Sequence, residues 1–447
     1  MTGNRRAAAL AGLVALVVAC AAPAEPMGSP AGSASRSAVP ATQSPRPTPT
    51  ATPTGTRADE LAFLVESLVR SHPDPFLGGT RAAFEERVAA LAARAGSLTF
   101  DEYLVEVMRL LGDRDRDGHT GIIPFAQGET GLDAWPLALY AFEEGIFVVG
   151  ALAPHDQLVG MRVVRIAGRP VDEIVELVTP LVAHDNPATI SARLPGYLVV
   201  PAVLRGLGLL GDGVSGLTLE AADGSTLDVT PDPIPMAEFR EWRGLFDPLV
   251  PPSLPADDDG PLSLRNRGER FWAEPVGDAL FVGYNQVLAS TDSGQSMTDL
   301  AATIAAAFAD GSVERVVVDV RHNSGGENGT SAPLRDVLLE QASRDPGSVA
   351  VLIGRSTFSA AGNFITELRS EPGVRFVGEP SGGAPNQFGD PAIYELPASG
   401  MWLHVATRDW EFAPGDDSLA IEPDVTVPVR WSDYAAGIDA ALEAALH

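Results

Sequence analysis

The sequence predicts an α/β protein with α+β character, and three patterns support this prediction. After residue 278, short aliphatic runs alternate with segments of helical spacing, which is typical of a largely parallel sheet covered by helices. Before residue 112, apolar residues recur every three or four positions, as in helices that bury one face. Between these parts, residues 135–235 mix strand-like and helix-like segments, which indicates a separate α+β module.

Each part divides into elements with recognisable limits. Helices are expected at 60–70, 81–95 and 101–111, and the prolines after His72 end the first of them. In the middle part we expect strands at 145–149 and 161–166, a helix at 171–178 and a hairpin at Asp223-Gly224. The last part should contain, in order, strand 280–284, helix 297–309, strand 313–320, helix 333–343 and the strand and helix of 349–368.

The first residues indicate processing and not fold. Arg5 and Arg6 precede a short apolar run that ends in small residues before Cys20, a run too short to span a bilayer. This pattern resembles a bacterial lipobox, in which Cys20 becomes the lipidated first residue. Cleavage after Ala21 is the alternative. Cys20 is the only cysteine, which excludes an internal disulfide and favours lipidation. Residues 21–57 consist largely of Ala, Pro, Ser and Thr and should form a disordered tether.

Charge and composition limit what the body can bind. The formal net charge is −28, which argues against nucleic acid because binding to phosphates depends on Lys and Arg. No second long apolar segment is present, so the expected membrane contact is the lipid at Cys20. The chain has no lysine, and arginine cannot lose its proton to act as a base. The sequence therefore predicts an extracytoplasmic, lipid-anchored protein.

The central candidate for catalysis lies in the segment 349–368, an aliphatic strand followed by a helix. Three hydroxyl residues, Ser356, Thr357 and Ser359, stand at the junction. A hydroxyl there can cap the helix by accepting a free amide. It can also act as a nucleophile, because the same free amides stabilise an oxyanion nearby.

A serine nucleophile needs a base, and two histidines are candidates. His119 follows Asp113-Arg-Asp-Arg-Asp-Gly, a spacing that imitates a calcium loop, but Pro124 occupies the position where such a loop carries a bidentate Glu. His322 opens the run His322-Asn-Ser-Gly-Gly326 after a predicted buried strand, and glycines there allow backbone amides to point into a site. His72 is expected in a loop without a catalytic role.

Four separated segments together resemble the tail-specific, or C-terminal processing, serine peptidases. They are Asp117-Gly-His-Thr120, 317–326, Thr357-Phe-Ser-Ala360 and Gly378-Glu-Pro-Ser-Gly-Gly383, and the closing Ile421-Glu-Pro-Asp-Val425 is similar to the end of that family. The resemblance implies a core of strand-strand-helix units similar to the crotonase/ClpP superfold and a PDZ-like module. Its boundaries would be a signal peptide 1–20, a tether 21–57, a helical subdomain 58–124, a PDZ-like module 125–235, a connector 236–277 and a catalytic core 278–447.

The resemblance also implies roles for particular residues. Ser359 would be the nucleophile, with an oxyanion hole from Gly325 or Gly326 and the amide of Ala360. Many members pair the serine with lysine, which this chain lacks, so it resembles the branch similar to the tricorn protease core, with Ser, His and an acid. In that branch His119 matches the base and Asp417 the acid, with His322 and Asp416 as rivals. Gly362 stands where the lysine-using branch usually has Glu.

The function expected from these residues is a serine peptidase that hydrolyses peptides or protein C-terminal tails through an acyl-enzyme. No cofactor and no metal are implied, since the chain has no His-Glu-x-x-His. Two alternatives stay open: an inactive member of the family that binds an apolar or peptide ligand, and an esterase-type acyl hydrolase, because triad chemistry is shared across acyl hydrolases. The substrate and the oligomeric state are not specified by the sequence.

Overall fold

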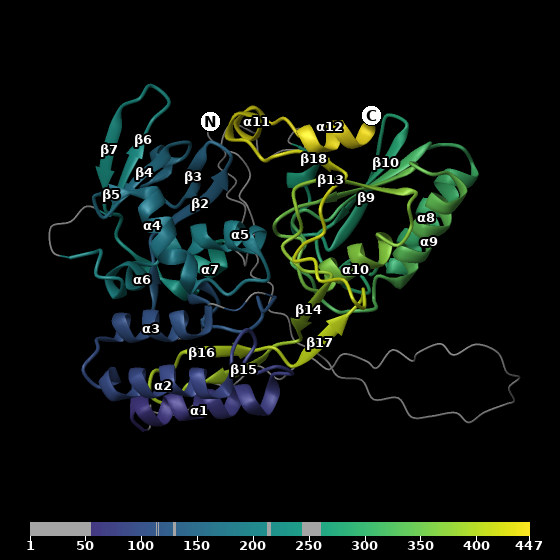
Figure 1. Ribbon diagram of the computed structural model, residues 1–447. Coiled ribbons are helices and arrows are strands. Elements are labelled where there is room, and N and C mark those ends of the chain that lie inside the picture. Colours follow the sequence, from purple (N-terminus) through teal and green to yellow (C-terminus); the bar gives the residue numbers. More distant parts are fainter. Residues whose placement is uncertain (1–54, 113, 115, 128–130, 212–215, 244–260) are drawn as a thin grey trace, which may run out of the picture. The chain divides into compact units, whose positions relative to one another are not determined.

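The computed structural model describes residues 55–112, 114, 116–127, 131–211, 216–243 and 261–447 (Figure 1). The predicted signal peptide, Cys20 and most of the tether lie outside these residues, as do Asp113, Asp115 and residues 244–260 of the expected connector. Within the described residues, no helix has the length and apolar character needed to cross a membrane.

Three helices open the described chain: α1 (Arg57–Ser71), α2 (Arg81–Ala95) and α3 (Phe100–Gly112). The side chain of Thr56 accepts a hydrogen bond from the Asp59 amide, and Asp59 bonds back to the Thr56 amide, so a capping box fixes the start of α1. Leu61, Leu64 and Leu68 are fully buried along one face of α1, as the helical spacing predicts. The three predicted helices are confirmed to within three residues at each end.

The middle of the chain forms an antiparallel sheet in the order β2-β3-β4-β6-β7, with β5 paired to β4. Its strands are β2 (Leu137–Phe142), β3 (Gly145–Ala151), β4 (Arg162–Ile166), β5 (Arg169–Pro170), β6 (Leu217–Glu220) and β7 (Thr226–Val229). The predicted hairpin at Asp223-Gly224 is confirmed between β6 and β7, where Gly224 has φ +82°, a conformation that favours glycine.

Helices and short elements surround this sheet. The helices are α4 (Val171–Val178), α5 (Pro187–Leu198), α6 (Pro201–Gly206) and α7 (Met236–Arg243). The short elements are η1 (Pro124–Ala126), β1 (Asp133–Ala134), η2 (Asp156–Leu158), η3 (Thr179–Leu181) and β8 (Ile234–Pro235), whereas η4 (Leu262–Leu264) packs through Leu262 on the strands of the last part of the chain. Asn186 caps α5 by accepting the Thr189 amide.

The last part forms a second sheet in the order β18-β13-β12-β11-β10-β9. In this sheet the neighbouring strands β10, β11, β12, β13 and β18 run parallel to one another. Strand β9 runs antiparallel to β10. The strands are β9 (Phe271–Val276), β10 (Ala279–Tyr284), β11 (Arg315–Asp319), β12 (Val349–Ile353), β13 (Val374–Gly378) and β18 (Val425–Thr426). The largely parallel sheet predicted from alternating strands and helices is thus confirmed.

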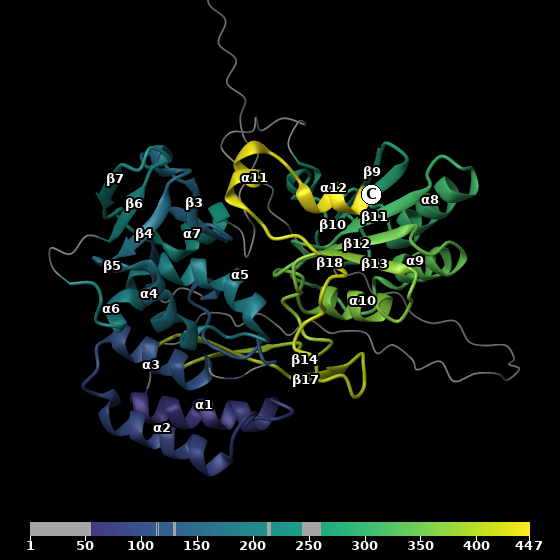
Figure 2. The ribbon, with the colours of Figure 1, turned by 45° about the horizontal axis from the view of Figure 1, so that its top comes forward.

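Both faces of this sheet are covered, which explains the continuous aliphatic runs of its strands. Alternate residues such as Val318 and Val351 pack with α8 (Met297–Ala309), α9 (Ala332–Arg344) and α10 (Ala360–Leu368). The intervening residues, Val317 and Leu352 among them, pack with α12 (Ala440–Leu446). Figures 1 and 2 show α12 and the α8–α10 group on opposite sides of the sheet. The short helix α11 (Trp431–Ala436) precedes α12.

A ribbon from the last part of the chain returns to the N-terminal helices. It consists of β14 (Asn386–Gly389), β15 (Ala392–Glu395), β16 (Trp402–Val405) and β17 (Arg408–Glu411), in which β14 pairs with β17 and β15 with β16. Leu396, Met401 and Leu403 belong to the same buried cluster as the residues of α1 to α3. The hydrophobic core around residues 58–112 is therefore completed by residues more than 280 positions later in the sequence.

Candidate active site

Ser359 lies at the junction between β12 and α10. Its backbone has φ +55° and ψ −129°, a region that non-glycine residues seldom occupy and that stores strain. Its side chain makes no capping hydrogen bond to α10. The hydroxyl therefore does not cap α10, and its hydrogen-bond partner is the His119 Nε2.

Thr357, the neighbouring hydroxyl, has a structural role. It donates to the carbonyl oxygen of Val320 at 2.8 Å and accepts the amide of Gly354 at 3.0 Å. The Phe358 amide donates to the carbonyl of Asn323 at 3.1 Å. These bonds tie the turn before Ser359 to the segment that follows β11.

The imidazole of His119 reaches Ser359 across 240 positions of sequence. Its Nε2 lies 3.0 Å from the Ser359 Oγ, within the range required of a base that takes the hydroxyl proton. The ring is 9% exposed and stacks on Phe358 with ring centroids 4.5 Å apart and an interplanar angle of 21°. His119 lies in the loop after α3, and Gly121 in the same loop pairs with His404 of β16.

The surroundings of His119 keep its ring neutral. Burial lowers the pKa of His119 to about 3, the Arg193 guanidinium lowers it as well, and Asp117 and the backbone of Phe388 oppose the shift. A neutral imidazole has a free nitrogen lone pair, which a base needs. The other ring nitrogen, Nδ1, is buried and has no hydrogen bond of normal geometry among the described residues, although the Phe388 backbone lies close enough to act on the ring as an acceptor.

The acidic residue expected at Asp417 occupies a different place. Its side chain is 95% exposed and lies 3.5 Å from the Arg116 guanidinium. Asp416, its rival, pairs with Arg369 at 2.8 Å. The segment 415–419 is largely solvated, so neither carboxylate contacts His119, and the geometry does not support either as its orienting acid.

Asp117, which the sequence places in a calcium-like spacing and in the Asp117-Gly-His-Thr120 segment, is the carboxylate that acts on His119. It is fully buried, its Oδ2 lies 2.9 Å from the Arg114 Nε and 3.1 Å from the His72 Nε2, and its charge raises the pKa of His119. His72 follows the end of α1, outside any helix or strand, as expected, and it is buried against Asp117. Among the described residues, no group of three or more potential ligands could hold a metal ion.

The glycines after β11 separate into two roles. The Gly325 amide donates to the Asn323 Oδ1 at 2.9 Å, so it is not available to an oxyanion, and this corrects its expected role. A Cβ on Gly325 would lie 2.7 Å from the Ser359 Cβ. The amides of Gly326 and Ala360 have no hydrogen-bond acceptor in the part of the chain that the structure describes, as an oxyanion hole requires.

Asn323, in the run His322-Asn-Ser-Gly-Gly326, also belongs to the site, although the sequence assigns it no role. It is fully buried, its Nδ2 donates to the Tyr284 carbonyl at 2.9 Å, and its Oδ1 holds Gly325. Its position directly before Ser-Gly-Gly was the available signal.

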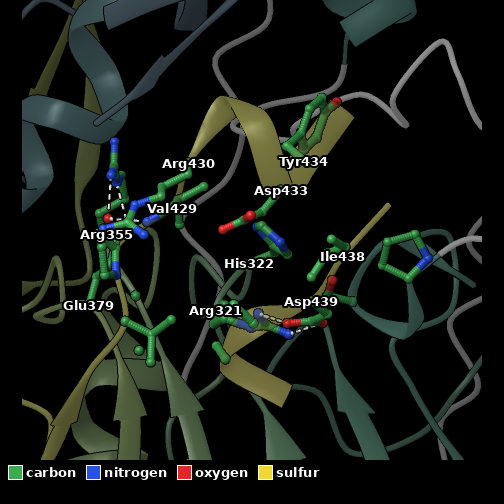
Figure 3. A pocket seen from close by; sticks show the side chains of 18 of the residues that line it. Arg321, His322, Arg355, Glu379, Val429, Arg430, Asp433, Tyr434, Ile438 and Asp439 are labelled. Atoms are coloured by element: carbon green, nitrogen blue, oxygen red, sulfur yellow. Dashed lines mark hydrogen bonds and ion pairs between the residues drawn. The ribbon is translucent and has the colours of Figure 1, made fainter. Parts of the chain in front are cut away.

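His322, the rival base, points into a different cavity (Figure 3). This cavity of about 90 Å³ is lined by residues that include Tyr140, Arg355, Asp433 and Asp439, and Ser359 is not among them. Burial lowers the pKa of His322 well below its usual value, and Arg267 and Arg321 lower it further. His322 therefore has no contact through which to deprotonate Ser359.

Comparison with known proteins gives a likeness of fold. No protein-family model and no curated protein matches the sequence. Among solved structures, mature CPAF aligns with a TM-score of 0.57 at 15% identity, over 87% of this chain and 95% of that chain. Mature CPAF complexed with lactacystin aligns with a TM-score of 0.55 at 14% identity, over 87% and 96%.

A third solved structure, the photosystem II D1 C-terminal processing protease, covers 84% of this chain and 94% of its own at 13% identity, but its TM-score of 0.35 is too low to support a conclusion. The CPAF structures and the D1 processing protease are tail-specific, or C-terminal processing, serine proteases, the family that the sequence motifs resemble. The chain has the fold of mature CPAF.

Proposed function

We propose that this chain is a serine peptidase that cleaves peptides or protein C-terminal tails through an acyl-enzyme on Ser359. The observation that supports this most directly is the 3.0 Å contact between the His119 Nε2 and the Ser359 Oγ. Serine is a weak nucleophile until a neighbouring base removes its proton, and a neutral, buried imidazole is such a base.

In the proposed reaction, the Ser359 Oγ attacks the scissile carbonyl carbon while His119 accepts the hydroxyl proton. The negative charge that develops on the carbonyl oxygen is stabilised by the amides of Gly326 and Ala360. His119 then gives its proton to the leaving amine, and the ester to Ser359 remains. Water deprotonated by His119 attacks this ester and releases the acid, which restores the serine.

We propose that the role expected of Asp417, to orient and stabilise the His119 ring, is divided between Phe388 and Asp117. For Nε2 to accept the serine proton, Nδ1 must carry the hydrogen, and the Phe388 backbone, which favours the protonated ring, is the acceptor that we propose for it. Asp117 favours the imidazolium through its charge without a hydrogen bond to the ring. We assign the orienting role to Phe388 and the electrostatic role to Asp117.

The finer features of the architecture are part of this proposal. The β10–β13 sheet with α8 to α10 supports a crotonase/ClpP-like core from 278 to 447, and the β2–β7 sheet with α4 supports a PDZ-like module from 125 to 235. The lipobox at Cys20 and the tether 21–57 support a lipid anchor on the outer face of a bacterial membrane.

A fluorophosphonate probe tests the proposal, because it reacts with activated serines. We expect the wild-type chain to label at Ser359, and Ser359→Ala and His119→Ala to abolish labelling while both variants keep the wild-type melting temperature. A folded wild type that never labels would refute catalysis. Parallel assays with peptide and ester substrates of the same acyl group separate a peptidase from an esterase, since only a peptidase cleaves both.

A further inference from the structure

The loop that carries His119 is held by a carboxylate outside the expected triad. Asp185 lies between η3 and α5 and is fully buried. Its Oδ1 accepts the Gly118 amide at 2.7 Å, and its Oδ2 accepts the Ala384 amide at 3.3 Å. Its carbonyl oxygen accepts the Arg116 amide at 2.9 Å. Asp185 thus accepts hydrogen bonds from two amides, those of Arg116 and Gly118, in the loop immediately before His119.

Arg193 of α5 completes this attachment from the other side of Gly118. Its Nη1 donates to the carbonyl oxygens of Gly118 at 2.7 Å and Ala183 at 2.6 Å. Its guanidinium lies 4.8 Å from the centroid of Phe358, the ring on which His119 stacks. The amide and the carbonyl of Gly118 are therefore both fixed by side chains of the segment 185–193.

Gly118 lies too close to Asp185 and Phe358 for a side chain to fit. A Cβ at this position would lie 2.9 Å from the Phe358 Cζ and 3.0 Å from the Asp185 Oδ1. A side chain at this position would therefore clash with both the carboxylate and the ring, and Gly118 is the residue that connects Asp185 to His119.

We propose that Asp185 is a positioning residue whose ionised carboxylate holds the Gly118 amide and thereby keeps His119 within reach of Ser359. This proposal rests on the function proposed above. The carboxylate oxygens accept one amide each, whereas a protonated carboxyl group has a hydroxyl that accepts the second amide poorly. Loss of the charge therefore releases one of the two amides and loosens the loop.

The charges around Asp185 place this change in a measurable range. Burial raises the pKa of Asp185 to about 6, the amides of Gly118 and Ala384 and the Arg193 guanidinium oppose the shift, and Asp117 adds to it. The pKa of His119 is lowered to about 3 by burial, so its ring stays neutral throughout this pH range. As the pH falls through 6, Asp185 is thus protonated while the base itself is still functional, and activity falls because of position and not because of base charge.

The experiment measures the rate of fluorophosphonate labelling of Ser359 from pH 4 to 8 in the wild type and in Asp185→Asn. In the wild type we expect the rate to fall below pH 6 by roughly 10- to 100-fold, the loss expected for a hydrogen bond to a buried charge. In Asp185→Asn, the carboxamide presents a donor to one of the two amides, so we expect the low rate at every pH and no step near pH 6. Asp416→Asn, which changes a partly exposed carboxylate paired with Arg369 and not in contact with the His119 loop, is the control and should keep the wild-type profile.

A second measurement does not depend on catalysis or on the variant. Hydrogen exchange of residues 116–121 in the wild type should increase as the pH falls through 6, after correction for the intrinsic pH dependence, while exchange in α10 stays unchanged. A wild type that never labels would refute the proposed function but leave this measurement informative. The proposal is overturned if the step near pH 6 persists in Asp185→Asn, or if the exchange of 116–121 does not change with pH.

Discussion

The ring of Phe358 lies nearly parallel to the ring of His119, with centroids 4.5 Å apart. The residue immediately before the candidate nucleophile therefore supports the candidate base, and the Arg193 guanidinium lies 4.8 Å from the same ring. The two partners of the proposed catalytic pair are thus linked through one side chain as well as through their own hydrogen bond.

Replacing Phe358 should weaken catalysis more than stability. Phe358→Leu removes the aromatic stack, which contributes about 0.5–1.5 kcal/mol in such pairs, so we expect kcat/KM for a peptide substrate to fall about 2- to 10-fold. Phe147→Leu, which removes a ring stacked on Trp431 with centroids 4.6 Å apart, is the control. Equal kcat/KM in Phe358→Leu and the wild type would show that the stack does not position His119.

Neutralising Asp417 should have little effect on the protein, whereas neutralising Asp117 should reduce both its stability and its activity. Asp417→Asn changes an exposed side chain paired with Arg116, and exposed ion pairs contribute little, so we expect less than about a twofold change in kcat/KM. Asp117→Asn leaves Arg114 and His72 beside a neutral group, and breaking a buried pair costs about 3–5 kcal/mol. We therefore expect a lower unfolding midpoint in urea and reduced activity. Loss of activity in Asp417→Asn with normal stability would restore the triad expected from the sequence.

A side chain at Gly325 should inactivate the site by steric conflict. In Gly325→Ala the Cβ would lie 2.7 Å from the Ser359 Cβ, at a φ of +112°, so we expect loss of fluorophosphonate labelling. Gly329→Ala is the matched control, because its φ of +87° is also unfavourable to alanine but no atom lies within 4 Å of the added Cβ. It should lose stability through backbone strain alone and still label. Labelling of Gly325→Ala at the wild-type rate would contradict the geometry.

The buried imidazole of His404 should make the fold less stable in acid. Burial lowers the pKa of His404 to about 4, whereas the unfolded chain has the ordinary value near 6.5. The unfolded state therefore binds more protons between these values, and the stability that the neutral ring provides above pH 6.5 is lost as the pH falls toward 4. At pH 5 this loss is about 2 kcal/mol.

Urea unfolding at pH 7 and pH 5 measures this effect. His404→Gln, which cannot titrate, should lose less stability between the two pH values than the wild type. His155→Gln is the control, because His155 lies in a turn before η2, outside the buried cluster around His119. An identical pH dependence in the wild type and His404→Gln would show that the ring is not the titrating group.

Much of the sheet and the strand-to-helix junction at Ser359 could be predicted because they depend on local pattern. Strand β12 is a run of five aliphatic residues, and the hydroxyls that follow it mark a strand-to-helix junction whatever the rest of the chain does. Asp417 could not be predicted correctly in the same way. Asp417 was expected to be the acid because it lies four residues before Ile421-Glu-Pro-Asp. In the structure its side chain is exposed and lies beside the Arg116 guanidinium.

The residues that hold His119 give no signal in the sequence, because each acts through a backbone atom or a ring brought from elsewhere. Asp185 accepts a hydrogen bond from the Gly118 amide. Because every residue other than proline has a backbone amide, the residue type at position 118 does not indicate that Asp185 binds there. Phe388 acts through its backbone, which is the same in every residue. The β15–β16 pair reaches the N-terminal helices only because both bury apolar faces in one core.

The amino-acid sequence alone determined that this protein has aliphatic strands alternating with helices, a hydroxyl cluster at one junction and no lysine to serve as a base, because these are properties of composition and of short-range spacing. The tertiary structure alone decided that His119 and not His322 faces Ser359, and that its neighbours are Asp117, Phe388 and Asp185. Contacts between segments hundreds of residues apart depend on how whole elements pack, and that packing is a property of the complete core and not of any one segment.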